Sequence, residues 1–212
     1  MAVFNIDGEL KPEAKDVLYE IGNVGVGTAI IPIGNIREME IKINTPKVVT
    51  TEKNLLEELS YDPNQIVVGV TTKMNDTFDG SILFMLSREF VHNMVNIMTD
   101  EDFDDEQLLK NEDSISAIQE MINYMTAGYA KVIGAYLNVP VFISAASLGM
   151  DKVKNVVDAV MNREGVKVDR IAYVNTEFTI IDEAGKKTDE VGQVLIFPDE
   201  KCIEAFIEIM GE

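Results

Sequence analysis

Two short patterns of polar residues in this chain each place a carboxylate and an amide on one face of a helix. In the first pattern, Glu20 and Asn23 are three residues apart, and Asp16 lies one turn before Glu20. An amide offers both a hydrogen-bond donor and an acceptor, whereas a carboxylate is an anionic acceptor. A Glu/Asn pair on a helix surface is ordinary when it occurs once, and simple solvation then explains it.

The second pattern repeats the first in the other half of the chain. One hundred residues later, Ser116, Glu120 and Asn123 occur with the same spacing. Two matched copies, each with Asp or Ser four residues before the glutamate, are much less ordinary than one. We therefore interpret each pattern as a candidate functional pair.

The elements around the two patterns repeat as well, which predicts two similar halves at residues 12–98 and 112–210. Each half is expected to begin with a long helix, at 12–33 and 112–137, that carries the polar pattern. A strand, a short helix, a hairpin of two strands and a closing helix follow in both halves. We expect these elements at residues 40–51, 52–59, 65–75, 80–86 and 88–98, and at 140–148, 151–161, 166–181, 190–197 and 199–210.

Hairpin-connected strands predict an antiparallel sheet, and the helices are expected to cover one face of it. The predicted fold class is α+β: an internally duplicated single domain over residues 1–212, with a six-stranded sheet and a pseudo-two-fold axis. The acidic stretch 99–113 is expected to join the halves as a solvated linker.

Three glycines, Gly22, Gly25 and Gly27, lie within the first long helix, where each costs on the order of 1 kcal/mol relative to alanine. We expect close approach of the second long helix to offset that cost. The second helix offers small residues for such a contact, namely Ala127, Gly128, Ala130 and Gly134. Pro32 predicts a kink or an end of the first helix near residues 31–32.

Composition excludes several classes of function. Acidic residues outnumber basic ones 37 to 18, for a net charge of −19, which disfavours binding to nucleic acids and to anionic membranes. A hydrophobic content of 46% is enough for a sizeable core. The N-terminal residues do not resemble a secretory signal, and no run of roughly 18 apolar residues is apparent, so we expect a cytoplasmic protein.

Common catalytic residues are scarce. The chain has one cysteine, Cys202, and one histidine, His92, which excludes a disulfide framework and sites built from several cysteines or histidines. We expect Cys202 to be a core residue and His92 to lie partly buried or exposed on a helix. The acidic run that begins at Asp100 has Asp105 and Asn111 where a calcium loop needs Gly and Glu, so we do not interpret it as a calcium site.

The two polar patterns resemble the conserved motif of the CheC/FliY/CheX phosphatase family. That motif reads Asp/Ser-x3-Glu-x2-Asn and is followed, after 22 further residues, by a proline. The first half of this chain matches it fully, with Pro46 as the proline, whereas the second half has Ala146 at that position. The duplicated layout and the length are similar to those of CheC-type members over essentially the whole chain.

The resemblance implies a protein phosphatase that hydrolyses the aspartyl phosphate of the chemotaxis response regulator CheY. By the same resemblance, Asn23 and Asn123 would orient the attacking water, and Glu20 and Glu120 would pair with a lysine of the regulator. Such a role fits the groups, because an amide can hold a water in one orientation without opposing the phosphoryl group with a negative charge. The supporting positions would be Asp16, Ser116 and Pro46.

The resemblance also implies that this chain binds no cofactor and no metal, because the Mg²⁺ belongs to the regulator. CheD is a further possible partner. An alternative is a non-catalytic adaptor of the same fold that binds CheD or flagellar switch components. A third interpretation is an unrelated acidic α+β protein in which the patterns arose by chance.

Overall fold

The two long helices predicted from the sequence are present in the computed structural model as α1 (Pro12–Arg37) and α3 (Glu112–Leu137). The other helices are α2 (Arg88–Thr99), α4 (Val153–Met161) and α5 (Glu200–Met210), with a 3₁₀ turn η1 (Leu55–Glu58). The strands are β1 (Glu40–Ile43), β2 (Lys47–Thr51), β3 (Ile66–Asn75), β4 (Gly80–Ser87), β5 (Phe142–Ile143), β6 (Ser147–Lys152), β7 (Ile171–Ile181) and β8 (Lys187–Pro198). The structure describes residues 3–5, 9–37, 40–51, 55–59, 61–75, 80–104, 106–138, 140–161 and 171–210.

The ends of the two long helices differ in how well the sequence predicted them. Asn111 caps the start of α3, where its side-chain oxygen accepts hydrogen bonds from two backbone N–H groups of the first turn. Asn138 follows the last turn of α3 in the left-handed conformation, with φ of 52°. Helix α1, by contrast, continues through Pro32 as far as Arg37, and the residue directly after the proline, Ile33, is buried in the core. An end of α1 at residues 31–32 is therefore wrong.

Every strand pair in the described part of the sheet is antiparallel, which confirms the predicted fold class. The order is β1-β7-β8-β4-β3-β5, with β2 also beside β7 and β6 also beside β3. The outer strands of each half thus pair with the hairpin of the other half, and β4 meets β8 in the middle. Exchanging the two halves reproduces the same order in reverse, as a pseudo-two-fold arrangement requires.

Each predicted outer strand is broken into two, so the described sheet has eight strands where we predicted six. The first break falls at residues 44–46, where Pro46 has no N–H for the ladder. The second falls at residues 144–146, where the Ser144 side chain accepts a hydrogen bond from the Lys73 backbone N–H (3.0 Å). The Ser144 carbonyl accepts another from the Thr72 hydroxyl (2.9 Å), so side-chain bonds replace part of the ladder.

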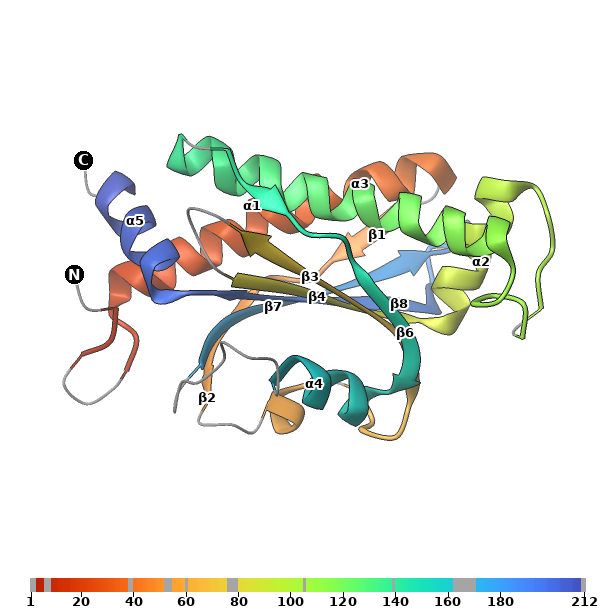
Figure 1. The fold of residues 1–212 in the computed structure, drawn as a ribbon, viewed down its shortest axis with the longest axis horizontal. Helices are drawn as coiled ribbons and strands as arrows, with labels where there is room; N and C mark the ends of the chain where they lie inside the picture. Colours follow the sequence, from red (N-terminus) through yellow and green to blue (C-terminus); the bar gives the residue numbers. More distant parts are fainter. Residues whose placement is uncertain are drawn as a thin grey trace.

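Helices cover both faces of the sheet, which corrects the expectation of a single covered face (Figure 1). Helices α1, α2, α3 and α5 lie on one face, and α4 and η1 lie on the other. Consecutive residues of the central strands point to opposite faces. Val68 and Phe84 therefore join the core under the long helices, while Val67 and Leu83 join a smaller core under α4.

Helix α1 is apolar because it is largely internal. Its stretch Pro12–Ile36 is long and apolar enough to cross a membrane, but 56% of the most apolar window is buried within the fold. The buried side chains, among them Leu18, Ile21 and Ile30, belong to the core between the long helices and the sheet. Core packing therefore accounts for the composition of this helix.

Candidate active site

The first polar pattern lies on the outer face of α1. Asp16 and Asn23 are exposed and Glu20 is partly buried, whereas Val17 and Ile21 between them point into the core. This alternation follows from helical periodicity, since positions 16, 20 and 23 share a face opposite to the apolar positions. The three polar side chains are thus displayed to solvent from a helix whose inner face is fixed by packing.

A tyrosine of the other long helix holds the glutamate of this pattern. The Tyr136 hydroxyl, on α3, donates a hydrogen bond to Glu20 Oε1 at 2.9 Å. Burial and the neighbouring Glu20 carboxylate raise the pKa of Tyr136, so its hydroxyl stays protonated as a donor. Sequence reasoning missed Tyr136, because nothing in the local pattern links it to a residue 116 positions earlier.

The second polar pattern lies on the outer face of α3. Ser116, Glu120 and Asn123 are all exposed, and the opposite face of the helix is buried. Here the glutamate is held from its own helix, because the Tyr124 hydroxyl donates to Glu120 Oε1 at 3.2 Å. Both amides and both carboxylates are therefore accessible to a partner that approaches the helical layer.

Pro46 packs against the inner side of α1, next to the first polar pattern. It is buried in the break just before β2, and a Cβ placed on Gly22 would lie 3.0 Å from the Pro46 Cβ. Gly22 directly precedes Asn23, so the proline packs against the backbone that carries the amide. In the second half the equivalent positions are Ile122, which is buried, and Ala146, which is exposed. The large and small residues are thus exchanged between the two halves.

The predicted close contact between the long helices is present at two of the glycines. A Cβ on Gly25 would lie 2.4 Å from the Tyr129 ring, and a Cβ on Gly128 would lie 2.7 Å from the Ala29 Cα. Gly22 instead packs against the sheet, and Gly27 has no such neighbour apart from a side chain of its own helix. The helices run in opposite directions on the same face of the sheet (Figure 1). The two polar patterns consequently lie toward opposite ends of one helical layer.

Cys202 and His92 both serve the fold. Cys202 is buried in α5, and burial together with the Asp199 charge raises the pKa of its thiol to about 12. This thiol is therefore no nucleophile at neutral pH. The His92 ring contacts the Phe103 carbonyl oxygen of the segment that joins the halves. In that segment the buried side chains of Phe103 and Leu108 anchor the acidic run to the core, so it is less solvated than we expected.

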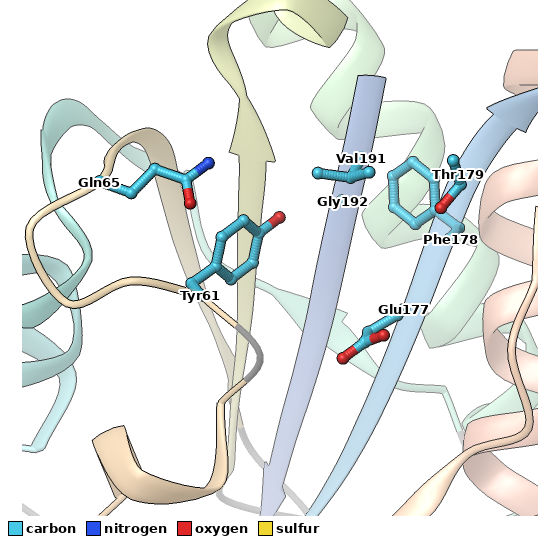
Figure 2. A pocket seen from close by; sticks show the side chains of 7 residues that line it. All are labelled: Tyr61, Gln65, Glu177, Phe178, Thr179, Val191 and Gly192. Carbon is cyan, nitrogen blue, oxygen red and sulfur yellow. The ribbon is translucent and has the colours of Figure 1, made fainter. Parts of the chain in front are cut away.

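A pocket of about 220 Å³ lies on the opposite face of the sheet from the two polar patterns. Figure 2 shows its lining residues, which come from the segment before β3 and from β7 and β8: Tyr61, Gln65, Glu177, Phe178, Thr179, Val191 and Gly192. Two of its polar groups already have structural partners. The Tyr61 hydroxyl donates to the Met85 carbonyl (3.4 Å), and the Asn44 amide donates to Glu177 (3.2 Å). We assign no role to this pocket in the reaction.

The chain is similar in sequence and in fold to proteins that are already known. No family model matches the chain. The CheY-P phosphatase CheC of Bacillus subtilis (strain 168) is 22% identical over 155 residues, which cover 71% of each chain. The crystal structure of Thermotoga maritima FliY superposes with a TM-score of 0.67 at 22% identity, covering 94% of this chain and 98% of that one.

The chain resembles the CheC/FliY/CheX family in sequence and shares the fold of that family. Another protein with the same fold is CheX of Borrelia burgdorferi, whose structure was determined in complex with CheY, BeF3 and Mg²⁺. It superposes with a TM-score of 0.51 at 14% identity, covering 84% of this chain and 97% of that one. The family resemblance inferred from the two polar patterns is thereby confirmed, whereas the roles of individual residues remain predictions.

Proposed function

We propose that this chain is a phosphatase that hydrolyses the aspartyl phosphate of a CheY-type response regulator. The observation that carries the proposal is the duplicated display of an exposed amide one turn from a carboxylate, on two paired helices of a family that includes a CheY-P phosphatase. A purely structural pair would not need to be exposed in both halves. The cytoplasm, where such a regulator works, is the location that this function implies.

Asn23 and Asn123 are the groups to which we assign the water. The amide oxygen accepts a hydrogen bond from the water, and the amide nitrogen donates one to a phosphoryl oxygen or to the water itself. The water oxygen attacks phosphorus in line, and the bond between phosphorus and the aspartyl oxygen breaks. The aspartyl oxygen keeps the bonding electrons as a carboxylate, and both water protons end on the released dihydrogen phosphate.

Positioning of this kind is sufficient for the rate that a signalling phosphatase needs. Phosphoryl transfer depends mainly on alignment and charge stabilisation, and the regulator supplies the acyl phosphate, the Mg²⁺ and a lysine. A hundredfold acceleration corresponds to about 2.7 kcal/mol of barrier lowering, which one well-oriented water can supply. On this account the chain itself needs no bound metal or cofactor.

Glu20 and Glu120 are the docking groups. Their negative charge makes direct contact with the phosphoryl group unfavourable, whereas a lysine of the regulator is a suitable partner. Each glutamate lies three residues before its asparagine, so a regulator held by the carboxylate brings its phosphate to the amide. Asp16 and Ser116 lie one turn further along the same faces and would contact the edge of the docked regulator.

The test is a decay measurement on a purified regulator that has been phosphorylated with acetyl phosphate and freed of the phosphodonor. Addition of this chain at a tenth of the regulator concentration is expected to accelerate phosphate release with multiple turnovers. Complex formation without acceleration would instead support the adaptor alternative. Neither binding nor acceleration with any CheY-type regulator would contradict the proposal.

A further inference from the structure

The two glutamates, which are equivalent in the sequence repeat, are held in different ways. Glu20 accepts its hydrogen bond from Tyr136 of the opposite helix at 2.9 Å. Glu120 accepts its bond from Tyr124, four residues along the same helix, at 3.2 Å. The contact in the first site therefore spans two elements, whereas the contact in the second is local and exposed.

The two sites differ because the residues at equivalent positions of the repeat differ. At the offset of 100 residues, the position equivalent to Tyr136 is Ile36, and the position equivalent to Tyr124 is Val24. Neither side chain can donate a hydrogen bond. The cross-helix contact thus belongs to the first site alone, and the local contact belongs to the second site alone.

Tyr136 is itself held in place by the core. Its ring packs against Phe206 of α5, with ring centroids 5.9 Å apart and an interplanar angle of 51°. Phe206 is buried, so the tyrosine rests on a fixed surface. Tyr124, in contrast, has half of its side chain exposed, at 51%, and its hydroxyl lies on the solvent side of α3.

We infer that Tyr136 is a positioning residue that pre-orients the Glu20 carboxylate for the regulator's lysine, so that the first site is ordered before docking and the second is not. The inference rests on the proposed function. Fixing a flexible side chain before association removes part of the ordering cost of binding. The saving corresponds to a KM for the first site that is about two- to tenfold lower than it would be without the hydroxyl.

The effect is expected in KM and not in kcat. The hydroxyl of Tyr136 bonds to the docking carboxylate, whereas the water is assigned to Asn23 on the next turn. An interaction that acts equally on the bound ground state and the transition state changes KM alone. A general disturbance of α3, in contrast, would act on both sites, because the second site lies on the same helix.

The experiment isolates the first site by working in an Asn123→Ala background. Adding Tyr136→Phe to that background is expected to raise KM for the phosphorylated regulator about two- to tenfold and to keep kcat within twofold. Combining it with Glu20→Gln should give a smaller effect than the two changes predict separately, because both remove the same contact.

Tyr129→Phe is the matched control. Tyr129 lies on the same helix, and its buried hydroxyl has no hydrogen-bond partner among the described residues. The substitution therefore removes the same hydroxyl group as Tyr136→Phe does, but one that holds no other side chain. Neither KM nor kcat should change. Thermal unfolding of each variant shows whether the fold is retained.

Normal phosphatase kinetics with an unchanged KM for the Tyr136→Phe variant would overturn the inference and leave the proposed function standing. An equal effect of Tyr136→Phe in the Asn23→Ala background, where the second site acts alone, would also overturn it by indicating a structural role. A wild-type chain without phosphatase activity is a different result, which removes the proposed function and this inference with it.

Discussion

Gly128 of α3 lies directly against the backbone of Ala29 in α1. A Cβ at Gly128 would be 2.7 Å from the Ala29 Cα and 2.9 Å from its backbone nitrogen. Such distances are shorter than any side chain tolerates, so the two helices approach as closely as they do because residue 128 is glycine. The contact fixes the relative placement of the two helices that carry the polar patterns.

Gly128→Ala is therefore expected to push the helices apart and to lower the free energy of unfolding by about 1–3 kcal/mol, the usual cost of overpacking. The matched control is Gly27→Ala, where a Cβ would meet only the Ile31 side chain at 3.9 Å. That change should be neutral or stabilising by up to about 1 kcal/mol, because alanine is the better helix former. Urea unfolding measures both variants, and equal stability of the two would contradict the packing argument.

Pro46→Ala tests the support beneath the first amide. The substitution removes ring atoms that pack against Gly22, next to Asn23, and it restores an N–H at a buried position. In an Asn123→Ala background we expect kcat to fall about three- to tenfold, since small misplacements of a positioning group are costly. In an Asn23→Ala background the same change should leave the rate of the second site intact. A loss shared by both backgrounds would point to general destabilisation.

The sequence predicted the elements better than it predicted the contacts between them. The bounds of α3 and of the closing helices, and the presence of the two hairpins, followed from periodicity and turn residues, which are local signals. The second strand of the second hairpin, β8, begins three residues earlier than predicted, and residues 166–170 of the other predicted strand lie outside the described residues. The breaks in the outer strands were missed, because at Ser144 two hydrogen bonds that involve side chains, donated by the Thr72 hydroxyl and by the Lys73 backbone N–H, replace part of the ladder. Such bonds depend on which strands become neighbours.

The same limit applies to the candidate site. Glu20 and Asn23 were found because helical spacing alone places them on one face. Tyr136 was not found, because its contact with Glu20 depends on how far the antiparallel helices slide past each other. The glycine-rich stretch predicted close packing correctly at Gly25, but it did not indicate that Gly22 packs against Val174 of the sheet and against Pro46.

Charge reversal at the carboxylates tests the docking role. Glu20→Lys together with Glu120→Lys is expected to raise KM for the phosphorylated regulator about thirtyfold, because an attraction of about 1 kcal/mol becomes a repulsion of similar size at each site, a change of about 2 kcal/mol. Asp158→Lys makes the same change of charge as each single reversal, at an exposed position of α4 on the other face of the sheet. It should leave KM within twofold. Identical effects of both kinds of reversal would mean that only the overall charge matters.

Cys202 gives a pH-dependent prediction, because burial, with the Asp199 charge, raises the pKa of its thiol from 9.0 to about 12. Between these values the unfolded chain loses the thiol proton while the folded chain keeps it. The stability contributed by the thiol is therefore complete below pH 9 and declines by about 1.4 kcal/mol per pH unit as the pH rises toward 12. Cys202→Ala should lose stability less steeply over this range in denaturant titrations. Parallel pH profiles of the two proteins would show that the thiol is not buried.

The central claim is that Asn23 and Asn123 each orient the water that attacks the regulator's acyl phosphate. Its most direct test is the decay rate of the phosphorylated regulator with the wild-type chain, with each single Asn→Ala variant and with the double variant, all checked for normal regulator binding. The account predicts partial activity for each single variant and, for the double variant, a decay no faster than that of the regulator alone. A double variant that still binds the regulator and dephosphorylates it at the wild-type rate would contradict the account.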